Sequence, residues 1–235
     1  VIVLGGGPAG STVATLLADK GFDVIVLDKD HFPRFHIGES LLPATVKIFD
    51  RLGVHEQIRE AFILKPGGKW LYGDKEVPGD FSKSDSRASF KEHPFSYLVE
   101  RSGFDKILID RSVAAGADVR FGTEVCKVLT DNGRVAGVRC RTEQGQEYDL
   151  RGRIVIDASG LRSVIPSMLN LRKLTQPHRM GIYAQYEAMP TRDDVKAGWF
   201  IGQMLYDGWT WLLRLPQDRF SVGVVLTVDR FRKSG

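Results

Sequence analysis

The chain has 235 residues, of which 43% are hydrophobic and 26% charged, values typical of a globular protein with one or two domains. Its 33 Lys and Arg residues are interleaved with 29 Asp and Glu residues, which argues against a nucleic-acid-binding tail. No apolar run approaches the roughly 20 residues of a membrane span, and nothing resembles a signal peptide.

The two cysteines, Cys126 and Cys140, are predicted to be reduced thiols of a cytoplasmic protein. A chain of this length buries roughly 70% of its unfolded surface, so it needs neither a disulfide nor a metal to hold its core. We therefore expect no metal site.

The first 28 residues follow a β-α-β pattern. Residues 1–4 and 24–27 are short apolar runs, which are typical of buried parallel strands. Between them lie a glycine-rich turn and an apolar helical pattern, which ends at Gly21 in the manner of a C-terminal glycine cap. This arrangement predicts a parallel sheet that is covered by a helix.

The rest of the chain alternates between helical and strand patterns. The strands after residue 118 have a period of two and are joined by Asn132-Gly133 and Gln144-Gly145 turns, as in an antiparallel meander. In chain order, the predicted elements are a helix over 45–52, a strand pair over 69–77, an exposed polar segment over 78–94, a helix over 102–115, strands over 119–121, 124–130, 135–142, 147–150 and 154–156, and a strand-rich section over 181–228.

The glycine-rich turn has the spacing Gly5-x-Gly7-x-x-Gly10, directly after a strand and before a helix. In this context the first glycine allows the tight turn, the second lets the backbone approach a pyrophosphate, and the third lets helix and strand pack closely. Asp28 ends the second strand, where a carboxylate can accept hydrogen bonds from ribose hydroxyls. The pattern predicts a dinucleotide site on the helix N-terminus, to which Pro8 and Ala9 also belong.

Two simpler interpretations of this turn stay open. The glycines could serve packing alone, and Asp28 could be a plain cap of its strand end. The glycine spacing also does not choose between FAD and NAD.

Three later segments carry a resemblance to a known family. Residues 32–43 read FPRFHIGESLLP, residues 100–105 contain ERS-x-FD, and residues 157–163 read DASGLRS. In this order they resemble motifs of the FAD-dependent oxidoreductases with the p-hydroxybenzoate-hydroxylase-type fold, and within them the chain is most similar to the flavin-dependent halogenases. The resemblance covers essentially the whole chain and implies FAD as the cofactor.

The resemblance implies a set of cofactor-binding residues beyond the glycine turn. Arginine forks suit an anionic or carbonyl-rich cofactor, although each arginine could instead form a surface ion pair. The acidic and hydroxyl residues could instead cap a helix or a loop. The residues implied are Arg34, Glu39, Ser40, Arg101, Asp157 and Gly160.

Two places concern halogenation itself. The family carries a lysine near Lys65, which by resemblance holds or activates the hypohalous acid; Lys69 competes for this role, and either could be a solvated loop lysine. The family also has a W-x-W-x-I-P motif that separates substrate from flavin. Trp209 and Trp211 match it and are predicted to line the substrate pocket, whereas Arg214 stands at the proline position.

The resemblance implies an α/β fold: a Rossmann-like three-layer FAD domain, with a parallel sheet, helices and an antiparallel β-meander, beside a second mixed-sheet substrate domain. We expect the FAD domain at 1–65 and 95–170 and part of the substrate domain at 66–94 and 171–235. The family's later Gly-Asp motif is missing, so the C-terminal part is expected to be absent.

The implied reaction uses reduced flavin, oxygen and halide to halogenate an electron-rich organic substrate, with a separate flavin reductase as partner. The alternatives are a flavin monooxygenase or a geranylgeranyl-reductase-like enzyme, a non-catalytic FAD-binding fragment, and an NAD-binding Rossmann enzyme.

Overall fold

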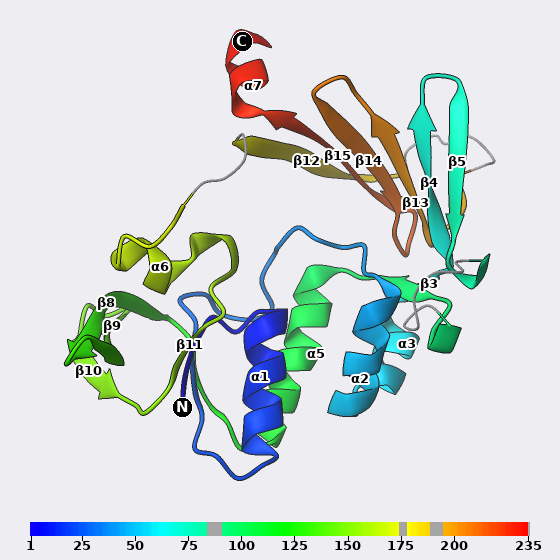
Figure 1. The fold of residues 1–235 in the computed structure, drawn as a ribbon. Coiled ribbons are helices and arrows are strands. Elements are labelled where there is room, and N and C mark those ends of the chain that lie inside the picture. The colour runs from blue at the N-terminus through cyan, green and yellow to red at the C-terminus, as the bar shows by residue number, and fades with distance from the viewer. Residues whose placement is uncertain (84–90, 174–177, 189–194, 235) are drawn as a thin grey trace. The chain divides into compact units, whose positions relative to one another are not determined.

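A computed structural model of the chain describes residues 1–83, 91–173, 178–188 and 195–234. It divides into two compact units (Figure 1): residues 1–37 with 101–173, and residues 38–100 with 174–235. Each unit is described by itself. No helix in the described ranges is both long and apolar enough to cross a membrane.

The first unit is built on a parallel four-stranded sheet in the order β11-β1-β2-β7. The helices α1 and α5 run side by side on one face of this sheet (Figure 1). Along β1, Val3 points to the helices, while Ile2 and Leu4 point to the other face. The elements are β1 (Ile2–Leu4), α1 (Pro8–Ala18), β2 (Ile25–Leu27), α5 (Arg101–Ala114), β7 (Asp118–Arg120), β11 (Val155–Asp157), the 3₁₀ turn η3 (Gly160–Arg162) and α6 (Val164–Met168).

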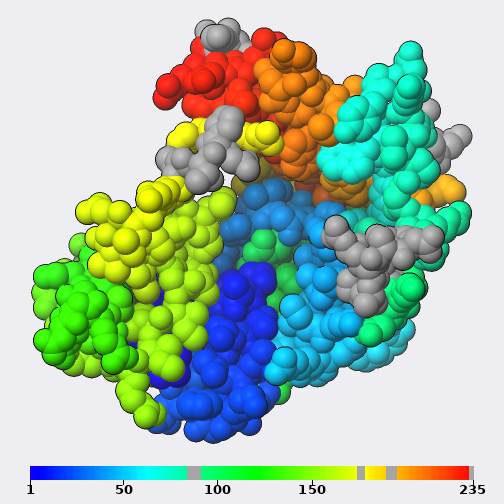
Figure 2. Space-filling view, viewed as in Figure 1, coloured from blue at the N-terminus to red at the C-terminus, as the bar shows by residue number. Residues whose placement is uncertain are grey.

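An antiparallel sheet of β8 (Thr123–Asp131), β9 (Arg134–Thr142) and β10 (Glu147–Arg151) covers the second face. Val138 and Cys140 of β9 are fully buried against β1 and β2. The opposite face of the meander, green in Figure 2, carries ion pairs such as Arg139–Asp149. Because both faces of the parallel sheet are covered, the predicted three-layer architecture is confirmed.

Turn chemistry fixes the meander as the sequence predicts. Asn132 and Gly133 both have positive φ and form the two-residue turn between Asp131 and Arg134. Two register irregularities follow, between Val125 and Lys127 and between Leu129 and Thr130. Both cysteines are free, as predicted.

The second unit is built on a six-stranded sheet in the order β12-β15-β14-β13-β4-β5 (Figure 1). The β13 and β4 strands pair in parallel and all other pairs are antiparallel, so the predicted mixed sheet is confirmed. Its strands are β4 (Gly67–Tyr72), β5 (Lys75–Asp80), β12 (Arg179–Glu187), β13 (Trp199–Met204), β14 (Gly208–Arg214) and β15 (Arg219–Thr227). The other elements are 3₁₀ turns η1 (Pro43–Thr45) and η2 (Phe81–Lys83), helices α2 (Val46–Leu52), α3 (His55–Ala61) and α7 (Val228–Ser234), and strands β3 (Ile63–Lys65) and β6 (Ser96–Leu98).

The compact units differ from the predicted domains at residues 171–173, which fall in the first unit, and at residues 38–65 and 95–100, which fall in the second. These residues pack with the second unit because β3 pairs with β6, Ser40 bridges to Leu98, and the Val99 N–H donates to the Glu39 carbonyl at 2.8 Å. Residues 84–90 of the predicted polar segment lie outside the described residues.

Candidate functional site

The first unit contains a cavity of about 590 Å³ at the carboxyl ends of β1 and β2. This is the edge of a parallel sheet at which ligands of open α/β folds bind. Eight residues predicted to bind the cofactor line this cavity: Gly5, Gly7, Pro8, Ala9, Asp28, Arg34, Arg101 and Gly160.

The three glycines of the turn meet different demands. A Cβ at Gly10 would lie 1.8 Å from the Gly5 carbonyl oxygen, so this glycine allows the close contact of helix and turn. Gly5 has a φ of +96°, and a Cβ there would lie 2.6 Å from the Ala158 oxygen. A Cβ at Gly7 would meet only the Arg34 guanidinium, at 3.5 Å, because Gly7 faces the cavity. Packing explains Gly5 and Gly10, but it does not explain Gly7.

Among the described residues, no side chain caps the N-terminus of α1. Gly7 is the N-cap residue, and Pro8 occupies the first turn. The amides of the first helical turn lack intrahelical partners, and together with the helix dipole they form a site for an anion. The backbone amides at this helix end therefore face the cavity wall without a capping side chain and can bind a phosphate.

Asp28 holds the turn together as well as lining the cavity. Its Oδ2 accepts a hydrogen bond from the Gly6 N–H at 2.7 Å, and its Oδ1 accepts one from the Asp30 N–H at 3.0 Å. A carboxylate can accept about four hydrogen bonds, so capacity for ribose hydroxyls is left. Asp28 therefore does cap the turn, as the simpler interpretation proposed. Its contact with the ribose stays a prediction.

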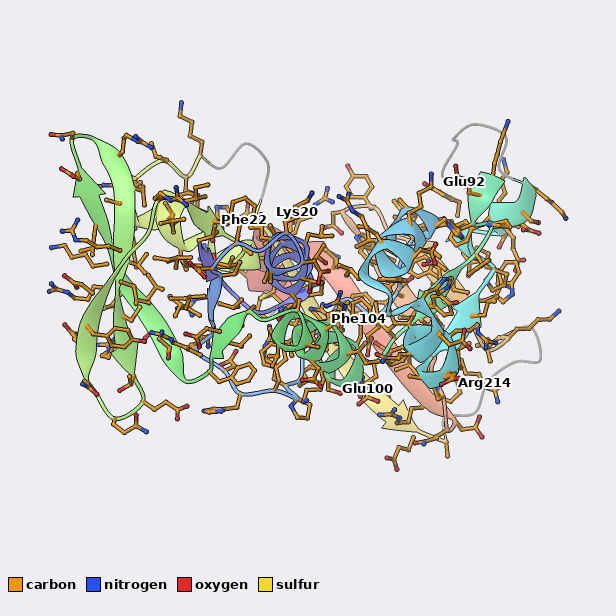
Figure 3. All side chains as sticks on the ribbon, turned by 90° about the horizontal axis from the view of Figure 1, so that it is seen from below. Lys20, Phe22, Glu92, Glu100, Phe104 and Arg214 are labelled. Atoms are coloured by element: carbon orange, nitrogen blue, oxygen red, sulfur yellow. The ribbon has the colours of Figure 1, made fainter. Side chains whose placement is uncertain are left out.

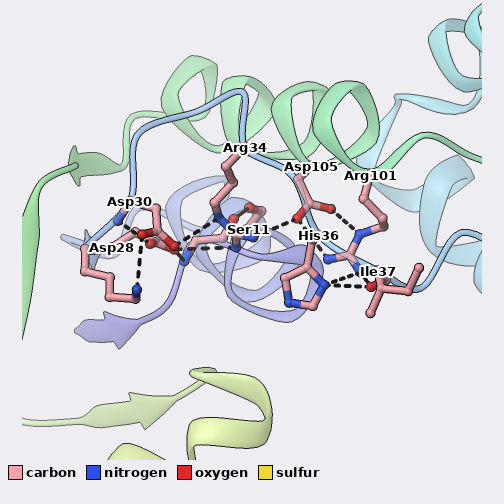
Figure 4. Close-up of polar contacts among 10 residues, drawn as sticks. Ser11, Asp28, Asp30, Arg34, His36, Ile37, Arg101 and Asp105 are labelled. Carbon is pink, nitrogen blue, oxygen red and sulfur yellow. Dashed lines mark hydrogen bonds and ion pairs between the residues drawn. The ribbon is translucent and has the colours of Figure 1, made fainter. Parts of the chain in front are cut away.

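Arg34 and Arg101 meet at one buried carboxylate (Figure 4). Arg101 forms a bidentate pair with Asp105, at 2.7 and 2.9 Å, and also donates to the Ile37 carbonyl at 2.8 Å. Arg34 lies 3.7 to 3.9 Å from the carboxylates of Asp105, Asp28 and Asp30. Its buried Nε has no hydrogen-bond partner among the described residues. Arg101 is therefore used in holding the loop, whereas Arg34 keeps donor capacity at the cavity.

Asp157 belongs to the turn behind the cavity. Its Oδ1 accepts from the Ser159 N–H at 3.0 Å, and its Oδ2 accepts from the Ile165 N–H at 2.8 Å. It does not line the cavity, but the following residues, from Ala158 to Arg162, do. Both carboxylate oxygens shape the turn that carries Gly160, and a direct cofactor contact of Asp157 stays a prediction.

Lys65 lies in the second unit, at the end of β3. It is 4% exposed, its Nζ donates to the Leu41 carbonyl at 2.8 Å, and it lies 5.1 Å from the ring of Phe81. No described residue forms an ion pair with it, and burial lowers its pKa to about 8. Lys69, in contrast, lies 3.4 Å from a Glu76 oxygen. The two candidate lysines therefore differ in their partners: Lys69 has a carboxylate beside it, whereas Lys65 is buried without a described ion pair.

We expect Lys65→Met to raise the stability of the protein at pH 7. The pKa of Lys65 is lower in the folded state than in the unfolded chain, so its protonation opposes folding below pH 8, by up to about 3 kcal/mol. This penalty fades as the pH rises from 8 toward 10.5. Urea unfolding at pH 7 and pH 9.5 should show a gain that shrinks at the higher pH, and an equal gain at both would contradict the buried ammonium.

The remaining predicted residues also lie in the second unit. Ser40 forms an isolated bridge with Leu98, and Glu39 is buried with its Oε1 accepting from Gln185 at 2.6 Å. Trp209 and Trp211 lie on one face of β14, with ring centroids 5.5 Å apart. Arg214, labelled in Figure 3, pairs with Asp218 at 2.7 Å, so the residue at the family's proline position is used in the turn before β15.

The sequence did not single out the cavity wall that comes from the meander. Thr123, Glu124 and Val125 line the cavity, and Arg162 lies 3.1 Å from Glu124. The alternating apolar pattern of these strands predicts which residues are buried, but it does not indicate which residues contact a ligand. Asp105 was visible within the ERS-x-FD segment, but its role as the shared partner of two arginines depends on the folded loop.

Comparison with known proteins points to flavoproteins. The family model described as "FAD binding domain" matches residues 1–206. The chain is 30% identical over 239 residues to a tryptophan 2-halogenase of Chondromyces crocatus, covering 99% of the chain and 44% of that protein. It is 32% identical over 226 residues to digeranylgeranylglycerophospholipid reductase 1 of Methanopyrus kandleri, covering 95% of the chain and 56% of that protein.

A solved structure supports the same comparison. The structure of the myxobacterial chondrochloren halogenase CndH superposes with a TM-score of 0.84 at 32% identity, covering 99% of the chain and 53% of that protein. The chain thus spans about half the length of the curated relatives it matches.

Proposed function

Because the chain belongs to the family of FAD-binding domains, we propose that it serves in the flavin-dependent halogenation of an electron-rich organic ring. Its cofactor is FAD. The observation that carries the proposal is Lys65, a buried amine without an ion-pair partner among the described residues, in the segment near which the resemblance implies a lysine of the halogenases. The halogenase relatives support the same reaction class.

The residues of the first unit fit FAD. The uncapped amides of α1 suit the diphosphate, and Gly7 leaves the space that its approach needs. The buried Nε of Arg34 lacks a partner, and a carbonyl-rich or anionic cofactor would supply one. Asp28 offers its remaining acceptor capacity to the ribose. Asp105 and Arg101 hold the loop of Arg34 and His36 in position.

Reduced FAD, when bound, supplies the activation of oxygen that halide oxidation requires. The chain itself positions the reactants, keeps water away from them and supplies a hydrogen-bond donor. At pH 7 the Lys65 amine is mainly protonated, since its pKa is about 8. Its ammonium donates a hydrogen bond to the oxygen of hypohalous acid and directs the halogen at the substrate ring. Trp209 and Trp211 line the pocket that receives this ring.

The partners follow from this chemistry. Halide and a small organic substrate are consumed, and a separate flavin reductase supplies the reduced cofactor. We place the protein in the cytoplasm, in keeping with its two free thiols.

A second function has its own support, namely the reduction of isoprenoid double bonds or a monooxygenation at the same FAD site. The departure at Arg214 interrupts the motif that separates substrate from flavin. The chain is 32% identical to the reductase of Methanopyrus kandleri, although the halogenases are the better supported relatives.

An assay with FAD, a flavin reductase with NADH, oxygen, bromide and an electron-rich ring such as indole separates these functions. We expect a product with the bromine isotope doublet in mass spectrometry, formed only when bromide and reduced FAD are both present. A hydroxylated product alone would indicate a monooxygenase. Saturation of a geranylgeranyl substrate without oxygen would indicate a reductase, and bound FAD without any turnover would indicate a non-catalytic module.

A further inference from the structure

Glu39 carries a buried carboxyl group that the proposed chemistry does not use. The residue is 2% exposed, and the Gln185 side-chain amide of β12 donates to its Oε1 at 2.6 Å. Its Oε2 is buried and has no hydrogen-bond partner in the part of the chain that the structure describes. Burial raises the pKa of this carboxyl by more than Ser221 and Gln185 lower it. The carboxyl thus lies in a setting that disfavours its charge, and its Oε2 has capacity to accept a hydrogen bond.

Trp211 is fixed by one polar contact and by close packing. Its indole N–H donates to the Ser221 hydroxyl of β15 at 3.1 Å, and the residue is 8% exposed. The ring lies over Gly223, where a Cβ would be 2.2 Å from it. Trp209 and Tyr183 flank it with centroids at 5.5 and 6.4 Å. Close packing and the hydrogen bond thus act together on the conformation of the Trp211 side chain.

Ser221 joins these two features. It is fully buried, it accepts from Trp211, and it lies opposite Gln185, the partner of Glu39, in the register of β15 and β12, so it is near both groups. The Ser221 oxygen receives the indole N–H, and its own O–H can be donated to the otherwise unpartnered Oε2 of Glu39. We propose that Glu39 is a positioning residue, which fixes the Trp211 indole through the Ser221 hydroxyl.

Its consequence for catalysis rests on the proposed function, in which Trp211 lines the substrate pocket. An indole free to turn would leave the substrate less well separated from the flavin.

The charged groups around Glu39 are few. Among the described residues, Glu100 raises its pKa and Arg219 lowers it, and these two form an ion pair at 2.5 Å, with Glu100 labelled in Figure 3. Glu187 faces Arg219 from β12. Each of these charges contributes less to the pKa of Glu39 than burial does.

The test compares Glu39→Gln, Glu39→Ala and Ser221→Ala by near-ultraviolet circular dichroism, with Trp211→Phe defining the Trp211 contribution. Gln keeps an oxygen for Gln185 and can donate an N–H to the Ser221 oxygen, so we expect it to retain at least about 80% of that contribution. Glu39→Ala and Ser221→Ala should each lose more than half of it. With rising pH the Trp211 contribution should change in the parent chain but stay constant in Glu39→Gln, since only the parent gains a charge beside Ser221.

The outcomes separate this role from the predicted cofactor contact of Glu39. The FAD Kd of each variant is measured alongside the spectra, because the resemblance also implies a cofactor contact for Glu39. An intact Trp211 signal in Ser221→Ala or in a folded Glu39→Ala would overturn the proposal. A Glu39→Gln variant whose FAD Kd rises tenfold while its Trp211 signal is unchanged would also overturn it. If Glu39→Ala fails to fold, Ser221→Ala and Glu39→Gln still decide the question. The spectra involve no halogenation, so the failure of the proposed function would leave this result standing.

Discussion

Replacement of Lys65 by methionine should abolish halogenation and leave FAD bound. Methionine fills a similar volume but cannot donate a hydrogen bond to an oxidant, and positioned donors of this kind typically contribute 100-fold or more to rate, about 3 kcal/mol. FAD binding should persist because Lys65 is not among the residues that line the cavity of the first unit. We expect brominated product to fall at least about 100-fold at equal flavin content.

Lys69→Met is the matched control for this experiment. Its ammonium lies 3.4 Å from a Glu76 carboxylate oxygen, unlike that of Lys65, so we expect its loss to change product yield by less than about threefold. The flavin absorbance of both variants reports cofactor content, and oxygen consumption shows whether reduced flavin still reacts. Loss of product in Lys69→Met with normal yield in Lys65→Met would move the role to Lys69.

Gly7→Val should produce a folded protein that no longer binds FAD. The backbone of Gly7 has a φ of −68° and a ψ of −175°, which any residue adopts, and a Cβ there meets only a guanidinium at 3.5 Å. The valine side chain would instead occupy the cavity wall at which the pyrophosphate approaches. We expect the FAD Kd to rise at least about 100-fold, while the Tm of the cofactor-free protein changes by only a few degrees.

Gly10→Ala provides the contrast, because its Cβ would lie 1.8 Å from a backbone oxygen that cannot move alone. This variant should lose stability even without cofactor, as a marked drop in Tm or as insoluble protein. FAD fluorescence titration and thermal unfolding of both variants separate binding from packing. A Gly7→Val protein with the parent's FAD affinity would mean that the turn serves packing alone.

Much of the fold was predictable because its signals are local. The glycine turn, the two apolar strands and the Asn132-Gly133 turn each determine their backbone from neighbouring residues, and the structure has all of them. Short elements such as α3 and β3 were missed, since seven or three residues give no clear periodicity. The bulge around Cys126 was also missed, because strand register depends on the partner strand.

The candidate site divides in the same way. The phosphate-binding turn was recognisable from residue type and spacing, whereas the arginines and the two rival lysines were candidates because the sequence resembles the flavin-dependent halogenases. Only the tertiary structure distinguishes Lys65 from Lys69, leaves Arg34 with an unpartnered nitrogen, and turns Glu39 toward Gln185 and Ser221. The reason is physical: burial, pKa and hydrogen-bond satisfaction depend on groups far away in the chain, which come together only when the sheets and loops pack.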